Sequence, residues 1–430
     1  MNVDQLYHYF ITCTSVTTDS RNCPEGSLFF ALKGENFDGN KFALSSLEKG
    51  CRYAVVDDEQ YAVDDRFLLV DSCLDALQQL AKIHRCRLKT PVIGITGTNG
   101  KTTTKELIAT VLSQKYNTLF TQGNFNNHIG VPLTLLQLKP EHEMAVIEMG
   151  ANHPGEIEIL ANIACPDFGI ITNVGKAHLE GFGSLEGVIR TKGELYDYIR
   201  ANGGSLFVNL DNPILSDLSA NITRVGYALT SEEAAAKGRI ISDGPFLKLV
   251  WKKSGEEPES PVKTNLIGEY NAENVLAAIC IGLHFGVTPE QINRALENYQ
   301  PTNNRSQFKE TEKNQLIIDA YNANPTSMNA SIINFRHMHA AKKAVILGDM
   351  FELGDQSQQE HQKIVDLLGE STFDKVILVG ERFGAIPSNF IKIADTSSLI
   401  AYLEKEQLSG YTVLVKGSHG MRLDKCVEQL

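Results

Sequence analysis

Short apolar runs alternate with longer amphipathic stretches through the middle of the chain, and this alternation limits the fold more than any other feature. The runs are "PVIGIT" (91–96), "MAVIEMG" (144–150), "FGIITNV" (168–174) and "SLFVNLD" (205–211). Apolar residues at successive positions are typical of a strand that is buried on both faces. Such strands, separated by helices, predict a parallel sheet with helices on both sides. The predicted fold class is therefore α/β.

The chain is too long for one hydrophobic core, because 430 residues usually divide into two or more domains. Residues 1–86 form one expected α/β unit, with strands in "SLFFALKG", "RYAVVDD" and "RFLLVDS" and a helix at 73–86. Residues 87–300 hold the parallel sheet, and 231–262 are expected to form an antiparallel edge. Residues 301–430 repeat the alternation and predict a smaller, doubly wound Rossmann-like domain.

The charge and cysteine content exclude several kinds of partner. The net charge is −12, whereas nucleic acids and anionic membranes both require a basic face, so neither is expected to bind. The eight cysteines show no C-x-x-C pattern, which favours buried thiols in a reducing compartment over disulfides or zinc ligands. There is no basic leader and no apolar run of about 18 residues. We therefore expect a cytoplasmic protein without membrane insertion.

The stretch "GITGTNGKTTTKE" (94–106) joins an expected strand to an expected helix. The backbone N–H groups of such a turn and the positive end of the helix dipole make a cradle for phosphate. Lys101 would reach the β- and γ-phosphates of a nucleotide, and the hydroxyl of Thr102 would bind Mg²⁺. The spacing from Gly97 is G-x-x-G-K-T, shorter than the usual phosphate loop, because Ile95 stands where the first glycine belongs. The alternative is an ordinary glycine-rich turn between a strand and a helix.

Two polar residues follow expected strands at the edge where open α/β sheets bind ligands. Glu148 ends "MAVIE", and His178 comes a few residues after "FGIITNV". Mg²⁺ prefers oxygen ligands, which Thr102 and Glu148 supply, whereas a histidine ligand is less usual. A solvated strand end is the alternative for Glu148, and an ordinary loop histidine is the alternative for His178.

Lys192 lies in the middle of an apolar stripe on the expected helix of "SLEGVIRTKGELYDYI" (184–199). A bare ammonium at such a position costs several kcal/mol unless it is paired. One interpretation is a lysine whose stem is buried while its amine reaches solvent. The other is a lysine that faces the metal site. As an amine it would repel Mg²⁺, but as a carbamate formed with CO₂ it would be an anionic oxygen ligand, and the sequence leaves both interpretations open.

Several longer motifs resemble those of the Mur ligases, the ATP-dependent amide-forming enzymes of peptidoglycan synthesis. "GTNGKTTTKE" and the positions of Glu148, His178 and Lys192 are common to the wider family. Motifs similar to those of the members that use D-alanyl-D-alanine are "GNFNNHIGVPLTLL" (123–136), "DAYNANPTSMNASI" (319–332), "LGDMFELG" (347–354) and "VKGSHGMRLD" (415–424). "TDSR" (18–21) and "FFALKGENFDG" (29–39) are similar to the unit that holds the UDP-sugar. The resemblance covers essentially the whole chain.

The resemblance implies a role for each matching position near the nucleotide phosphates. These would be held by Gly97, Thr98, Asn99, Gly100, Lys101, Thr102 and Thr103. One Mg²⁺ would lie among Thr102, Glu148 and His178. Lys192 resembles the family's carbamylated lysine, which helps to hold a second Mg²⁺. The residues implied in catalysis are Lys101, His178, Lys192 and Arg305.

The resemblance also implies contacts with the rest of ATP and with the two acceptor substrates. Asn271 would recognise adenine with Asn274 nearby, and Asp319 would contact the ribose. Arg305 would reach the phosphates from the domain junction, although it sits in "TNNRSQ" where a glycine is expected just before the arginine. The implied substrate contacts are Ser20, Arg21, Asn126, Asn127, Asn322, Asn324 and Lys416. For the third domain to meet ATP it must close onto the second, which predicts a hinge near 298–306.

The implied reaction joins D-alanyl-D-alanine to UDP-N-acetylmuramoyl-tripeptide through an acyl phosphate, in a protein that we expect to be monomeric. One alternative is another ligase of the family, which adds an amino acid to an earlier muramyl peptide or to a folate. A second alternative is a P-loop switch that hydrolyses ATP or GTP to regulate a partner. A switch would not need the C-terminal unit that carries "YNANP" and "KGS".

Overall fold

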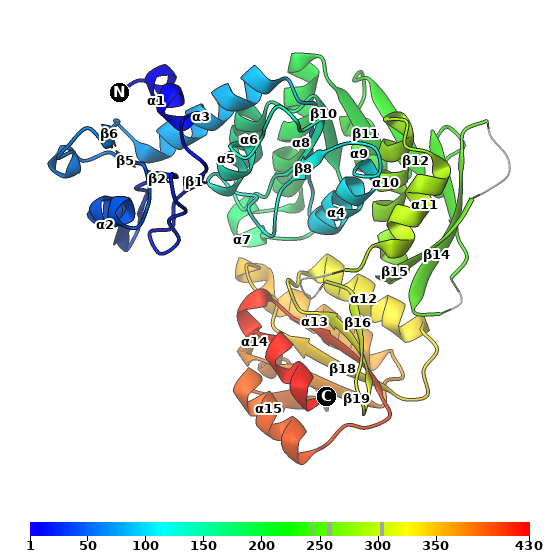
Figure 1. The fold of residues 1–430 in the computed structure, drawn as a ribbon. Coiled ribbons are helices and arrows are strands. Elements are labelled where there is room, and N and C mark those ends of the chain that lie inside the picture. The colour runs from blue at the N-terminus through cyan, green and yellow to red at the C-terminus, as the bar shows by residue number, and fades with distance from the viewer. Residues whose placement is uncertain (243, 256–259, 302–304) are drawn as a thin grey trace.

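The structure, a computed structural model, describes residues 1–242, 244–255, 260–301 and 305–430. These residues form three α/β domains, with the N-terminal domain beside the central one and the C-terminal domain packed on another side of it (Figure 1). The α/β fold class expected from the sequence is confirmed. Among the helices of the described residues, none is both long and apolar enough to cross a membrane.

The N-terminal domain is built on a small parallel sheet in the order β1-β2-β5-β6. Its strands are β1 (Val16–Thr17), β2 (Leu28–Phe30), β5 (Tyr53–Val56) and β6 (Phe67–Leu69), with a hairpin of β3 (Lys33–Gly34) and β4 (Phe37–Asp38). Its helices are α1 (Val3–Phe10), α2 (Ala43–Glu48) and α3 (Cys73–Leu88). The predicted strands and the predicted helix at 73–86 are confirmed.

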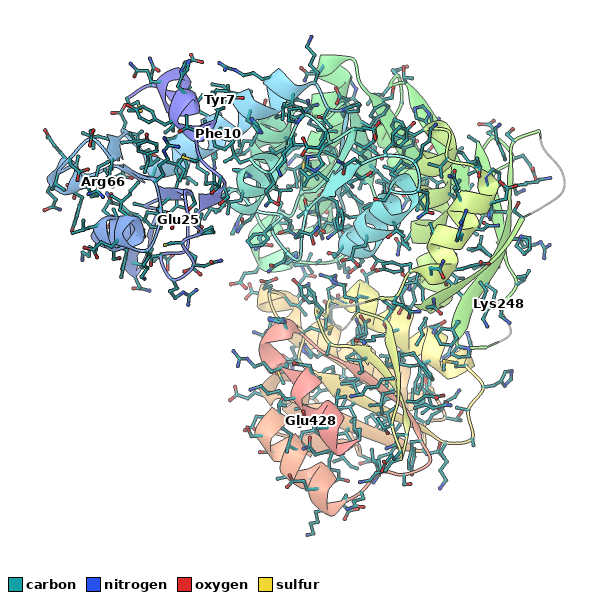
Figure 2. All side chains as sticks on the ribbon, viewed as in Figure 1. Tyr7, Phe10, Glu25, Arg66, Lys248 and Glu428 are labelled. Carbon is teal, nitrogen blue, oxygen red and sulfur yellow. The ribbon has the colours of Figure 1, made fainter. Side chains whose placement is uncertain are left out.

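Helix α3 joins the N-terminal domain to the central one. Tyr7 and Phe10 lie on α1 (Figure 2). Their rings lie 6.0 and 4.9 Å from the His84 ring of α3. On its other side His84 places Nε2 2.8 Å from the backbone oxygen of Leu138 in the central domain. The first domain is therefore held to the second by side-chain packing as well as by the chain.

The central domain holds a sheet in the order β15-β14-β13-β12-β11-β10-β7-β9-β8. Its strands are β7 (Val92–Thr96), β8 (Thr118–Phe120), β9 (Met144–Glu148), β10 (Phe168–Ile171), β11 (Ser205–Asn209), β12 (Arg224–Ala228), β13 (Ala236–Ile240), β14 (Phe246–Lys253) and β15 (Ser260–Ile267). Pairing is parallel from β8 to β13 and antiparallel between β13 and β14 and between β14 and β15. The predicted parallel sheet with an antiparallel edge is confirmed.

Helices cover both faces of the central sheet, which explains its uninterrupted apolar strands. The helices are α4 (Lys101–Leu112), α5 (Gly130–Leu135), α6 (Glu156–Ala164), α7 (Leu179–Phe182), α8 (Leu185–Asn202), α9 (Pro213–Leu218), α10 (Ala272–His284) and α11 (Pro289–Asn298). Helices α4, α10 and α11 share one apolar cluster with the sheet, and α5, α6 and α8 share the cluster on the other side. Every residue of β7 and β9 is buried as a result.

The C-terminal domain holds a sheet in the order β16-β17-β21-β18-β19-β20, which is parallel except for the edge strand β16. Its strands are β16 (Gln307–Glu310), β17 (Gln315–Asp319), β18 (Lys343–Gly348), β19 (Lys375–Val379), β20 (Ile391–Ile393) and β21 (Thr412–Lys416). Its helices are α12 (Pro325–His337), α13 (Ser357–Gly369), α14 (Glu381–Gly384) and α15 (Thr396–Lys405). The predicted smaller doubly wound domain is confirmed.

Short 3₁₀ helices punctuate the loops: η1 (Gly39–Phe42), η2 (Glu59–Tyr61), η3 (Glu269–Asn271), η4 (Gly354–Gln356), η5 (His419–Met421) and η6 (Leu423–Gln429). Between the central and C-terminal domains, α11 ends at Asn298 and β16 begins at Gln307. The hinge expected near 298–306 includes 302–304, which lie outside the described residues, so it stays a prediction.

Candidate active site

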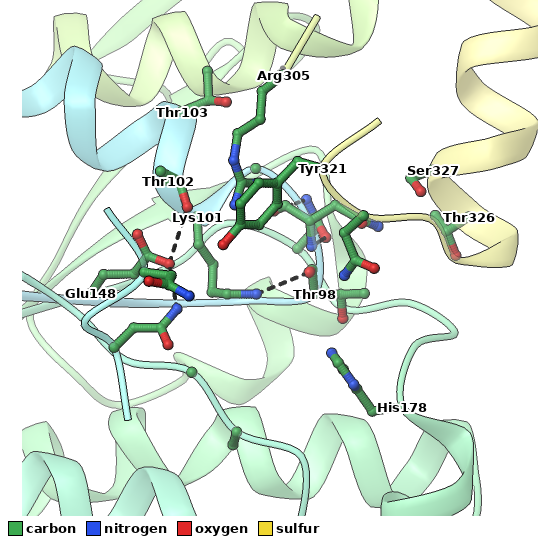
Figure 3. A pocket seen from close by; sticks show the side chains of 18 of the residues that line it. Thr98, Lys101, Thr102, Thr103, Glu148, His178, Arg305, Tyr321, Thr326 and Ser327 are labelled. Carbon is green, nitrogen blue, oxygen red and sulfur yellow. Dashed lines mark hydrogen bonds between the residues drawn. The ribbon is translucent and has the colours of Figure 1, made fainter. Parts of the chain in front are cut away.

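A cavity of about 1370 Å³ lies where the three domains meet. It is lined by these residues that the sequence singled out: Thr98, Asn99, Gly100, Lys101, Thr102, Thr103, Asn126, Asn127, Glu148, His178, Asn271, Asn274, Arg305, Asp319, Asn322 and Lys416. Figure 3 shows side chains of the central and C-terminal domains converging on it. The N-terminal domain contributes Leu74 and Gln78 from α3. Positions far apart in the sequence therefore form one site.

The loop before α4 is held open by bonds to the neighbouring strand. The backbone N–H groups of Thr98 and Asn99 each donate to Asn173, at 2.9 Å. Gly100 precedes α4 with φ 77° and caps it without a side-chain bond, so the first N–H groups of the helix remain available to an anion. At Gly97, with φ 145°, a Cβ would stand 2.0 Å from the Thr172 hydroxyl. The loop has the shape of a phosphate cradle and depends on these glycines.

Lys101 is folded back over the loop. Its Nζ donates to the backbone oxygens of Gly97 at 2.8 Å and Thr98 at 3.1 Å. The pKa of Lys101 is lowered to about 8, chiefly by burial; the Glu148 charge opposes this shift and the Arg305 charge adds to it. A lysine held this way would have to release the two carbonyls before it could bind another anionic group.

Glu148 is 1% exposed, so the interpretation of a solvated strand end is wrong. Its Oε1 accepts from the Thr102 hydroxyl at 3.1 Å and from the Asn126 amide at 2.8 Å. Its Oε2 has no hydrogen-bond partner among the described residues. An orphaned carboxylate oxygen beside a threonine hydroxyl is a donor set that suits Mg²⁺, which usually takes few protein ligands. The described residues contain no cluster of three or more His, Cys, Asp or Glu around a metal position.

His178 is held by the C-terminal domain. It precedes α7 with φ 49°, and its Nδ1 pairs with the carboxylate of Glu352. This contact lowers the pKa of Glu352. In Figure 3 the His178 ring lies apart from Glu148, with the Lys101 side chain between them. The structure thus brings Thr102 and Glu148 into contact and places His178 on another side of the same cavity.

Lys192 does not reach solvent. It is 2% exposed, so the interpretation of an amine that escapes to water is wrong. Its Nζ donates to the backbone oxygen of Ala151, a residue of the cavity wall, at 3.3 Å and lies 5.2 Å from the Phe182 ring centroid. Burial lowers the pKa of Lys192 to about 7, and the charge of Lys101 adds to this effect. At pH 7 about half of such amines are neutral, and the neutral amine is the form that reacts with CO₂.

The asparagines assigned to adenine are linked by a chain of hydrogen bonds. Asn274 donates to Asn271 at 2.9 Å and accepts from the Thr104 hydroxyl of α4 at 3.0 Å. Asn271 donates in turn to the backbone oxygen of Ile267 at 2.8 Å. These hydrogen bonds join α10 to α4.

The C-terminal domain carries its predicted residues to the same cavity. The Arg305 guanidinium lies 3.7 Å from the ring centroid of Tyr321. Lys416 donates to Asp319 at 2.5 Å and to the backbone oxygen of Asn322 at 3.3 Å. A cation and an acid thus stand together where the ribose and the acceptor are expected.

Asn324 does not line the cavity but bridges two domains at its edge. It accepts from the Ser327 N–H at 2.8 Å, which caps α12, and donates to Asn99 of the loop before α4 at 2.7 Å.

Gly97 and Lys192, like Asn324, are not among the residues that line the cavity. Ser20 and Arg21 lie away from it, and the Arg21 side chain is 88% exposed and paired with Asp19.

Sequence reasoning missed several residues of the site. Asn173 anchors the phosphate loop, Tyr321 stacks on Arg305, Glu352 holds His178, and Lys105 lies beside Glu148. Lys105 had a signal, because it follows Lys101 by four residues and therefore lies on the same side of the helix. Asn173, Tyr321 and Glu352 contact residues from segments remote in the sequence, and such contacts leave no local pattern.

Three family profiles match the chain in order. They are "Mur ligase family, catalytic domain" at residues 12–85, "Mur ligase middle domain" at 95–282 and "Mur ligase, glutamate ligase domain" at 304–419. The chain is 35% identical to the UDP-N-acetylmuramoyl-tripeptide--D-alanyl-D-alanine ligase of Bacillus subtilis, over 96% of this chain and 92% of that protein. It is 35% identical to the Escherichia coli enzyme of the same name, over 98% of this chain and 94% of that protein.

Solved structures show the same similarity in space. A crystal structure of MurF from Acinetobacter baumannii has a TM-score of 0.87 at 31% identity and covers 100% of this chain and 98% of that one. The MurF ligase of Thermotoga maritima in complex with ADP has a TM-score of 0.87 at 27% identity and covers 98% of this chain and 97% of that one. Both comparisons extend over all three domains.

Proposed function

The chain belongs to the Mur ligase family, and on that premise we propose how its own residues carry out the reaction. It is an ATP-dependent ligase of the type that joins D-alanyl-D-alanine to UDP-N-acetylmuramoyl-tripeptide in peptidoglycan synthesis. Its solved relatives that act on other acceptors, a UDP-N-acetylmuramate-alanine ligase and a folylpolyglutamate synthase, are only 16% and 13% identical. The observation that carries the assignment of roles is the single cavity, shared by the phosphate loop, Glu148, Arg305 and Lys416.

The reaction must turn a carboxylate, whose leaving group would be oxide, into a better electrophile. Transfer of the γ-phosphoryl group of ATP to the tripeptide carboxylate gives an acyl phosphate, whose leaving group is phosphate. The amine of D-alanyl-D-alanine attacks the carbonyl, and the tetrahedral intermediate collapses to an amide. The protein contributes positioning and charge neutralisation more than covalent chemistry.

The cationic side chains of the cavity bring the two anions together. Lys101 exchanges its bonds to Gly97 and Thr98 for bonds to the β- and γ-phosphate oxygens, and Arg305 approaches them from the C-terminal domain. Thr102 and Glu148 would hold a Mg²⁺, with His178 on another side of the cavity. A Mg²⁺ held there would offset the charge of the phosphates.

As a carbamate, Lys192 would help to hold a second Mg²⁺ near the acyl group. Its buried position and lowered pKa support this role, because only the neutral amine adds CO₂. The carbamate would replace a buried cation by an anionic oxygen donor directed at the wall of the cavity at Ala151. Lys192 would then contribute to the metal site without lining the cavity as an amine.

The remaining contacts follow the arrangement of the domains. Residues 1–86 hold the uridine diphosphate, 87–300 hold ATP, and 301–430 close over both. The nucleoside of ATP is recognised by Asn271, Asn274 and Asp319, and the two acceptor substrates by Ser20, Arg21, Asn126, Asn127, Asn322, Asn324 and Lys416. Because one chain supplies the whole cavity, the protein works as a monomer, in the cytoplasm where ATP and UDP-linked precursors are found.

Phosphate release in the presence of ATP, UDP-N-acetylmuramoyl-tripeptide and D-alanyl-D-alanine tests these roles. Omission of either acceptor should reduce the release strongly, whereas a nucleotide switch would release phosphate without them. Lys101→Ala should lose essentially all activity, and the exposed Lys82→Ala on α3 should keep it. If Lys101→Ala retained more than about a tenth of the wild-type rate, a barrier change below about 1.4 kcal/mol, the phosphate site would be misassigned.

A further inference from the structure

Lys105 is a buried cation that the reaction as described does not use. It lies in α4, one turn after Lys101, and is 0% exposed. Its Nζ has no hydrogen-bond partner among the described residues. An ammonium in the interior without such a bond is a strong net cost to the folded state. Packing alone does not explain a lysine there, since methionine would fill the same space without the charge.

Two carboxylates flank this ammonium at equal distance. Lys105 Nζ lies 3.7 Å from Glu148 Oε2 and 3.7 Å from Glu106 Oε1. Both distances are longer than an N–H···O hydrogen bond, so the interaction is one of charge. The Phe120 ring, with its centroid 5.8 Å away, closes another side.

Each carboxylate is fixed from its far side and offers its other oxygen to Lys105. Glu148 Oε1 accepts from Thr102 and Asn126, which leaves Oε2 facing the lysine. Glu106 Oε2 accepts from the Tyr299 hydroxyl at 2.6 Å, which leaves Oε1 facing it. The arrangement holds one positive charge between two fixed negative ones. Of these two carboxylates, Glu148 lines the cavity and Glu106 does not.

We propose that Lys105 is a positioning residue whose ammonium sets the charge of the metal and phosphate site. Its positive charge partly offsets the negative charge of Glu148, and Glu106 reduces that offset by attracting the same ammonium. This inference rests on the proposed role of Glu148 as a metal ligand. With the offset in place, a divalent cation alone binds weakly and an anionic nucleotide is not repelled. Glu148 would then bind the metal mainly when nucleotide is also bound, because the negative phosphates add to the attraction for the cation.

Lys105→Met gives the direct test, because it removes the charge and keeps the volume. The dissociation constant of ADP, measured in EDTA, should rise on the order of tenfold, and that of Mn²⁺, measured without nucleotide, should fall by a similar factor. The two constants move in opposite directions only if the charge matters. A lysine with a merely structural role would shift both constants the same way or neither, and that result would overturn the proposal.

Glu106→Gln gives the mirror experiment and does not depend on whether Lys105→Met folds. Loss of the second carboxylate leaves the Lys105 charge acting on Glu148 alone, so Mn²⁺ should bind more weakly and ADP more tightly. The exposed Lys82→Met serves as the control and should change neither constant. Unchanged binding in Glu106→Gln, or a shift of both constants in one direction, would contradict the charge-setting role.

Glu148→Gln separates this inference from the proposal on which it rests. If Glu148 ligates the metal, this variant should lose the Mn²⁺ site altogether. Retained Mn²⁺ affinity in Glu148→Gln would refute the metal role of Glu148. Loss in Glu148→Gln, together with same-direction shifts in Lys105→Met, would refute the role of Lys105 alone.

Discussion

Lys192→Met is expected to stabilise the folded protein while it abolishes ligation. The Lys192 side chain is 2% exposed, and burial with the charge of Lys101 lowers its pKa from the ordinary 10.5 to about 7. Each pH unit of difference between folded and unfolded states corresponds to about 1.36 kcal/mol. The protonated amine therefore costs the folded state roughly 5 kcal/mol, which methionine avoids.

The sign of this effect fixes its dependence on pH. Below about pH 7 the amine is protonated in both states, and the wild type bears the whole cost. Between about pH 7 and 10.5 only the unfolded chain keeps the proton, so the stability of the wild type rises with pH relative to the variant. At pH 7 the variant should melt higher by on the order of 10 °C for a domain of about 200 residues. This difference should shrink steadily towards pH 10.

Differential scanning calorimetry in CO₂-depleted buffer measures this difference, because a carbamate on Lys192 would replace the cation whose cost is at issue. Lys82→Met, an exposed substitution, is the control and should follow the wild type at every pH. A melting difference that stays constant between pH 7 and 10, or a variant less stable than the wild type, would refute the argument from burial. Ligase activity of Lys192→Met near the wild-type rate would refute the role of the carbamate. Added bicarbonate should raise the activity of the wild type and leave that of Lys192→Met unchanged.

Two further substitutions test the loop and the domain contact. Gly97→Ala should abolish ADP binding in a calorimetric titration, because at φ 145° a Cβ would lie 2.0 Å from the Thr172 hydroxyl. Gly384→Ala, with open space around its Cβ, is the control and should bind ADP normally. Normal binding by Gly97→Ala would mean that the loop is built differently. Glu352→Ala removes the partner of His178 across the domains, and since the carboxylate is 53% exposed the loss is about 1 kcal/mol at most. Small-angle scattering of the ligand-free protein should show a larger radius of gyration for Glu352→Ala, and an identical profile would exclude a role in closure.

The sequence predicted those parts of the fold and of the site that are encoded locally. Apolar runs such as Met144–Glu148 could be identified as buried strands because a sheet covered on both faces leaves no polar alternation. The glycine-rich loop before α4 could be singled out as a candidate phosphate site because its glycines, Lys101 and Thr102 lie together in the chain. The placement of Glu148 at the cavity followed from the rule that parallel strands bring their carboxyl ends to one edge.

Contacts between remote segments could not be predicted in the same way. Whether the Lys192 amine reached water depended on how α8 packs against Ala151 and Phe182, and periodicity along one helix does not contain that information. The pairing of His178 with Glu352 depends on how two domains approach each other. Lys105 was overlooked for another reason: lysines mostly lie on exposed faces, whereas α4 is buried against α10 and the sheet.

We infer that the described contacts between the central and C-terminal domains are too weak to hold the domains together without ligand. Lys176 pairs with Glu360 at 2.8 Å while remaining 39% exposed, and such pairs contribute roughly 0–1 kcal/mol each. Leu179 of α7 packs into the apolar cluster of the C-terminal domain, which adds about 2 kcal/mol. The His178–Glu352 pair and the Asn324–Asn99 hydrogen bond cross the same boundary and add about 1 kcal/mol each at most. The sum is a few kcal/mol, of the same order as the entropy lost when a domain is immobilised. ATP, reached by Lys101 from one domain and Arg305 from the other, would therefore favour closure through its own binding energy, which makes completion of the active site depend on the substrate that it activates.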